Sequence, residues 1–68
     1  MNLTIDSEQE EDGRWLAEVL ELPGAMVYGR TREEAMAKAQ ALALRVVAER
    51  LEHGEMLLEP LNILFAAA

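Results

Sequence analysis

The chain has 68 residues, with 6 basic and 13 acidic side chains, a formal net charge of −7 and no cysteine. This length allows one domain, over residues 1–68, with a thin core, and the lack of cysteine excludes disulfides and thiolate metal ligands. The acidic balance has the wrong sign for neutralising nucleic-acid phosphates, so we expect no direct nucleic-acid binding. It suits solubility or a basic protein partner, and the small core suggests association with other chains.

Hydropathy excludes a membrane segment. Charged residues interrupt every apolar stretch well before the roughly 18 residues that a span requires. Residues 1–4 show neither the basic charge nor the apolar run of a signal peptide. We therefore expect a cytoplasmic location and no membrane contact.

Residues 3–29 predict three short strands joined by tight turns. Apolar and polar residues alternate over residues 3–8, with Leu3 and Ile5 pointing inward. Residues 10–13 end in Asp-Gly, which predicts a hairpin turn into a second strand over residues 14–20. Pro23 and Gly24 suit a type II turn, and a third strand over residues 25–28 ends at Gly29. Together these strands predict an antiparallel meander.

A long helix follows. Thr31 and Glu34 match a capping box, with Thr31 as N-cap and Glu34 reaching back to it. His53 and Gly54 predict the helix end, since glycine suits the left-handed position after a helix. The helix then spans roughly 22 residues, or about 33 Å. Its apolar stripe recurs at helical spacing: Ala35, Ala39, Leu42, Val46 and Val47, widened by Met36, Ala43 and Leu51.

The last segment predicts a fourth strand. Pro60 argues against a helix continuing into it, and Leu61, Ile63 and Phe65 alternate with their neighbours. A right-handed crossover would place this strand parallel to an earlier one, and we expect residues 66–68 to be a frayed end. The predicted fold class is α+β in the order β-β-β-α-β: a three-stranded antiparallel meander, one long helix, then a fourth strand.

Three motifs in order resemble the HicB antitoxin family: GRWLAEV at residues 13–19, LPGA at 22–25 and GRTREEA at 29–35. The match runs from Gly13 to about Leu51. The resemblance implies a degraded ribonuclease H-like domain that binds and blocks HicA, a small basic ribonuclease toxin. Longer members add a C-terminal DNA-binding domain that this sequence lacks, so it resembles a short form and direct repression of an operon is not expected.

Candidate binding residues lie on the strand face opposite Trp15, Ala17 and Val19. A sheet with one face on a helix normally solvates the other, so apolar residues there suggest burial against a partner. This predicted surface, here called the open-face patch, comprises the apolar residues Leu16, Leu20, Met26 and Tyr28, with Glu18 at its rim. Either this patch or the edge of the last strand is the expected association surface, for a toxin or for a homo-oligomer (a dimer or tetramer). Trp15 itself fits the core better than an interface.

We expect no catalysis, metal or cofactor. Ribonuclease H-type chemistry needs clustered acids, and the candidates are Asp6, Glu49 and Glu52, with Asn62 where another acid would help. One carboxylate in place is not a two-metal site. His53, the only histidine, suits a helix-end position without a chemical role.

Overall fold

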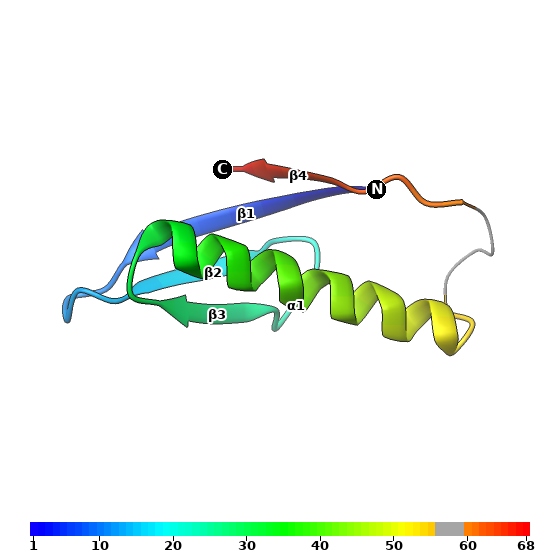
Figure 1. Ribbon diagram of the computed structural model, residues 1–68, viewed down its shortest axis with the longest axis horizontal. Coiled ribbons are helices and arrows are strands. Elements are labelled where there is room, and N and C mark those ends of the chain that lie inside the picture. Colours follow the sequence, from blue (N-terminus) through cyan, green and yellow to red (C-terminus); the bar gives the residue numbers. More distant parts are fainter. Residues whose placement is uncertain (56–59) are drawn as a thin grey trace.

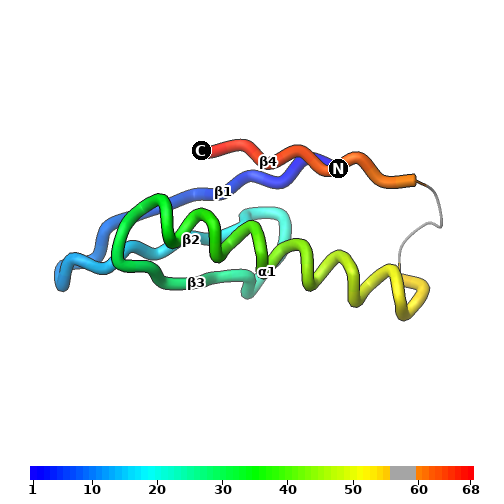
Figure 2. The backbone as a smooth tube through the Cα atoms, in the orientation of Figure 1, coloured from blue at the N-terminus to red at the C-terminus, as the bar shows by residue number. Residues whose placement is uncertain are grey.

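The computed structural model describes residues 1–55 and 60–68 and shows a four-stranded sheet with one helix across a single face (Figure 1). The elements in chain order are β1 (Asn2–Gln9), β2 (Trp15–Val19), β3 (Met26–Gly29), α1 (Arg32–Glu52) and β4 (Leu64–Ala67). The sheet order is β3-β2-β1-β4. β2 is antiparallel to both β1 and β3, whereas β4 is parallel to β1 (Figure 2). The predicted α+β class and the β-β-β-α-β order are confirmed.

Both predicted turns are present. In the β1–β2 hairpin, Gly13 has a φ of 92° and donates its N–H to the carbonyl of Glu10 at 3.0 Å. In the β2–β3 connection, Gly24 has a φ of 86°, and the Ala25 N–H donates to Leu22 O at 3.0 Å. These positive φ values are accessible to glycine without a steric penalty, which explains why glycine occupies both positions.

The helix begins and ends where the sequence predicts. The Thr31 hydroxyl accepts the Glu34 N–H at 3.0 Å. The reciprocal half of the capping box differs from the prediction, because the Glu34 carboxylate accepts the N–H of Arg30, at 3.3 Å, and not that of Thr31. Ion pairs with Arg30 and Lys38 hold the carboxylate in this place.

At the other end of α1, His53 is the C-cap and Gly54 adopts a φ of 71°. The Glu55 N–H donates to Arg50 O at 2.8 Å, and the Gly54 N–H to Leu51 O at 3.2 Å. These two bonds form a Schellman motif, which satisfies carbonyl groups that a helix otherwise leaves unpaired.

The core lies between α1 and the sheet and is built from small side chains. On the helix, the fully buried positions recur every four residues: Ala35, Ala39, Ala43 and Val47. On the sheet, Ile5 and Val19 are the largest fully buried side chains, and Trp15 packs half-buried against the same cluster, as the core interpretation predicts. The alanine row lets the helix lie close to the strands.

β4 lies later in the chain than predicted: it begins at Leu64, so the expected strand positions Leu61 and Ile63 precede it, and it ends at Ala67. We expected residues 66–68 to fray, but Ala66 and Ala67 belong to β4, in register with Thr4 and Ile5. The Ala68 N–H also donates to Ile5 O at 2.9 Å. Alanine has little intrinsic preference for strands, so backbone pairing with β1, and not the side chains, orders this segment. Local sequence reasoning could not detect that pairing.

Candidate functional site

One face of the sheet is left uncovered by α1. Side chains alternate between faces along a strand, so the neighbours of buried Ile5, Ala17 and Val19 point away from the helix. This open face carries large apolar side chains at the surface: Leu20, Met26 and Tyr28 are 50%, 47% and 45% exposed, and Leu16 is half-buried. A solvated sheet face does not require apolar residues in such number, which makes this face the candidate site.

Strand register brings the open-face patch together. Leu16 lies directly opposite Tyr28, and Glu18 lies opposite Met26, across the β2–β3 pair. Leu20 comes immediately after β2, and its N–H donates to Thr4 O at 3.0 Å. Glu18 thus lies inside the patch and is not only at its rim. The five residues named from the sequence therefore occupy adjacent positions on β2, on β3 and directly after β2.

Two further acidic residues, which the sequence analysis did not assign to the patch, adjoin it from β1. Asp6 lies opposite Glu18, and Glu8 lies opposite Leu16. Like charges at directly opposed positions destabilise a sheet. Among residues 1–55 and 60–68, no ion pair involves Asp6, Glu8 or Glu18. Even-numbered residues of β1 point to the open face, and the hairpin register places Asp6 and Glu8 beside the patch. Alternation within β1 alone does not reveal that register.

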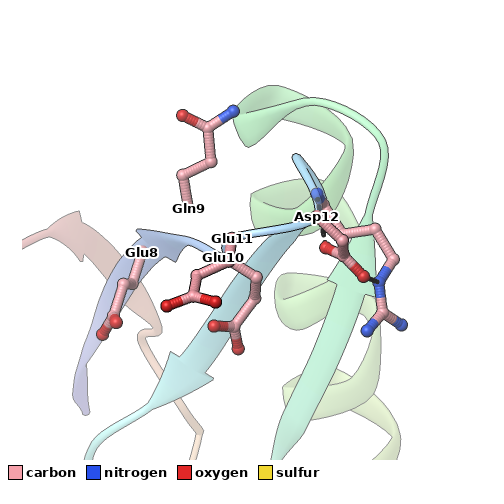
Figure 3. Close-up of a pocket in the computed structure, with 6 residues that line it drawn as sticks. Glu8, Gln9, Glu10, Glu11 and Asp12 are labelled. Atoms are coloured by element: carbon pink, nitrogen blue, oxygen red, sulfur yellow. Dashed lines mark hydrogen bonds and ion pairs between the residues drawn. The ribbon is translucent and has the colours of Figure 1, made fainter.

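The acidic surface continues to the end of the β1–β2 hairpin. A shallow depression of about 460 Å³ lies there, lined by Glu8, Gln9, Glu10, Glu11, Asp12 and Arg14. In Figure 3 the carboxylates of Glu8, Glu10 and Glu11 lie on one side of the hairpin, while Gln9 points to the other. Asp12 is neutralised by Arg14 at 2.7 Å, and hydrogen bonds from the Arg14 backbone N–H and guanidinium lower the pKa of the Asp12 carboxyl. The glutamates extend the negative charge of the open face.

A second depression, of about 330 Å³, has a more basic lining: Arg14, Tyr28, Gly29, Arg30, Glu34 and Lys38. Its cations already have partners within the chain. Arg30 and Lys38 both pair with Glu34, at 3.4 and 3.3 Å, while Arg14 pairs with Asp12 and lies over the Tyr28 ring, 4.3 Å from its centroid. Hydrogen bonds from the Arg30 N–H and from Lys38 lower the pKa of Glu34. Every cation of this lining thus has a carboxylate partner, although Arg30 and Lys38 share a single carboxylate, that of Glu34.

The structure separates the residues considered for metal-dependent chemistry. Asp6 points to the open face, whereas Glu49 and Glu52 belong to α1 on the opposite side of the sheet, and Asn62 is exposed before β4. In the part of the chain that the structure describes, no group of three or more His, Cys, Asp or Glu side chains is placed to hold a metal ion. His53 donates its backbone N–H to Glu49 O in the helix cap.

Comparisons with known proteins add no match: no protein-family model, no curated protein and no solved structure matches this chain. The resemblance to HicB antitoxins therefore rests on the residue pattern alone. The described residues also contain no helix with the length and apolar character needed to cross a bilayer.

Proposed function

We propose that this protein is a non-catalytic, antitoxin-like module that binds and neutralises a small basic ribonuclease of the HicA type in the cytoplasm. The observation that carries the proposal is the composition of the open face. Three carboxylates without an ion-pair partner in the described residues (Asp6, Glu8 and Glu18) lie in register with exposed apolar side chains of the open-face patch. The HicB-like motifs supply the class of partner.

The two kinds of side chain have different tasks in such a complex. Negative charge on one face accelerates encounter with a basic protein, and apolar contacts then slow dissociation. A cation of the toxin placed between Asp6 and Glu18 would relieve the repulsion between two opposed carboxylates. Bound over the catalytic surface of the toxin, the module would block the toxin by excluding RNA. This inhibition requires no chemistry from this chain.

Introducing a positive charge on the open face tests the proposal. Leu16 lies at the centre of the face, between Glu8 on β1 and Tyr28 on β3, so Leu16→Lys places an ammonium group where a basic partner should dock. We expect the dissociation constant for a purified HicA-type ribonuclease, measured by calorimetry, to rise at least about a hundredfold. RNA cleavage by the toxin should then no longer be inhibited.

The matched control is Leu44→Lys. Leu44 is 47% exposed on α1, on the other side of the sheet, so the substitution adds the same charge away from the open face. It should leave the affinity for the toxin unchanged. Equal binding by wild type and Leu16→Lys would contradict the proposal.

The alternative is a HicB-like homo-oligomer with a structural or regulatory role and no toxin partner. It is favoured by the uncharged residues 60–68, which include β4 at one edge of the sheet. An adjacent reading frame encoding a short basic protein would favour the antitoxin function. A stable homo-oligomer from native lysate, with no such frame beside the gene, would favour the alternative.

A further inference from the structure

The sheet has two outer strands, β3 and β4, and they differ in how much backbone they offer to another strand. The N–H of Val19, in β2, donates to Ala25 O, just before β3. The backbone N–H and C=O groups of Ala25, Val27 and Gly29 therefore face β2, and those of Met26 and Tyr28 face outward. The Met26 N–H is already used, because it donates to Gly24 O at 3.0 Å. The β3 edge is therefore short and partly satisfied.

The β4 edge is open. Leu64 donates its N–H to Met1 O, and Ala68 donates its N–H to Ile5 O, both at 2.9 Å. Backbone groups alternate in direction along a strand, so the N–H and C=O groups of Phe65 and Ala67 point away from β1. Proteins commonly protect such an edge with a charge, a proline or a bulge, but residues 61–68 contain neither a charged side chain nor a proline.

We propose that β4 pairs with β4 of a second copy of this chain, antiparallel and about a two-fold axis, to form one continuous sheet. Opposing Phe65 to its own copy places Ile63 opposite Ala67 of the other copy, so that the outward backbone groups of these residues bond across the axis. The same approach covers Leu64, which at 64% is the most exposed large apolar side chain of the described residues.

Electrostatic repulsion disfavours self-association through the open face but not through the β4 edge. An isologous interface brings each residue near the same surface of its partner. Joined to itself, the open face would bring Asp6, Glu8 and Glu18 of both copies together, in a chain of net charge −7. Residues 60–68 contribute no side-chain charge, so self-pairing there avoids that repulsion. The two surfaces thus fit different partners: a basic protein on the open face and a second copy at the edge.

A proline substitution tests the edge without removing a bond to β1. The Ala67 N–H faces outward, so Ala67→Pro removes only a donor to the second copy and places the ring where its strand would lie. Light scattering should give the wild type about twice the chain mass of 7.6 kDa. Ala67→Pro should raise the dimer dissociation constant at least about tenfold, and Ala67→Ser, which keeps the N–H, should remain a dimer.

Amide hydrogen exchange of the wild-type protein provides a measurement that does not depend on the folding of a variant. Exchange at Phe65 and Ala67 should slow as protein concentration rises, while exchange at Tyr28, which faces outward on β3, should not. A wild-type monomer at all concentrations, or a folded Ala67→Pro that remains fully dimeric, would overturn the inference. So would dissociation of the dimer by Leu16→Lys. None of these outcomes bears on toxin binding, which is measured on the other surface with a different protein.

Discussion

The same strands form both faces of the sheet, but the two faces differ in the burial and charge of their side chains. Beneath α1, the strands present Ile5, Ala17 and Val19, all fully buried and closed by small helix residues. On the other face, the alternate positions of the same strands carry apolar side chains that remain half exposed beside carboxylates without ion-pair partners in the described residues. The covered face has the composition of a domain core, and the open face combines exposed apolar side chains with carboxylates, the feature on which the proposed binding of a partner rests.

If the open face binds a partner as proposed, this small domain divides its apolar residues between stability and binding. Burial on the helix side supplies the free energy of folding, since hydrophobic stabilisation follows the apolar area removed from water. Apolar side chains left at the surface contribute little to the folded monomer and become useful only when a partner covers them. Substitutions on the two faces should therefore separate stability from binding.

The largest expected effect comes from truncating the same type of side chain on each face. Ile5 is 1% exposed and Leu20 is 50% exposed. We expect Ile5→Ala to lower the free energy of unfolding by about 3 kcal/mol, because it leaves a cavity under the helix, and Leu20→Ala by about 0.5 kcal/mol. Urea titrations at one protein concentration measure both. Equal losses would show that the open face belongs to the folding core and would break the comparison.

The covered face was more predictable than the open one, for a physical reason. Alternation in β1 and the helical stripe that includes Ala35 and Ala39 repeat at short range, so one sequence window reveals them. Asp6 joins Glu18 only through the register of the hairpin, and Ala67 is ordered only by pairing with Ile5 far along the chain. The exact register between two paired segments leaves no pattern within one sequence window, and this is why both the acidic row and the bounds of β4 escaped prediction.

A second, smaller effect concerns the close approach of the helix to the sheet at Gly29. A Cβ atom at Gly29 would lie 2.5 Å from the Ala35 backbone N and 2.8 Å from its Cα. Because backbone must move to admit it, we expect Gly29→Ala to cost about 2 kcal/mol in thermal unfolding. Tyr28→Ala, on the open face one residue away, should cost about 1 kcal/mol or less.

The double variant Gly29→Ala with Ala35→Gly sharpens this test. Removing the Ala35 methyl leaves the two closer contacts, with N and Cα, in place. The second substitution should therefore not rescue the first. Full recovery of the melting temperature would mean that the helix position is set by side chains alone, and the close approach would then not explain the glycine.

The smallest expected effect is a pH dependence of stability that arises from Glu21, next to the open face. Glu21 accepts the Thr4 backbone N–H at 2.6 Å and its hydroxyl at 2.8 Å, joining the β2–β3 connection to β1 next to Leu20. These bonds lower the pKa of Glu21 below its ordinary value of 4.5. A carboxyl whose pKa is lowered by folding stabilises the fold above its unfolded pKa, and that contribution disappears as the pH falls through the folded value.

Glu21→Gln should therefore lower the melting temperature slightly at pH 7 and flatten its decline in acid, since the amide does not titrate. Glu33→Gln serves as the matched control, because Glu33 lies exposed in the first turn of α1 without a comparable contact from Thr4. Melting curves followed by circular dichroism from neutral pH into acid separate the two. Parallel curves for wild type and Glu21→Gln would show that the contact with Thr4 does not persist in solution, and the loop that positions Leu20 would then be held by backbone bonds alone.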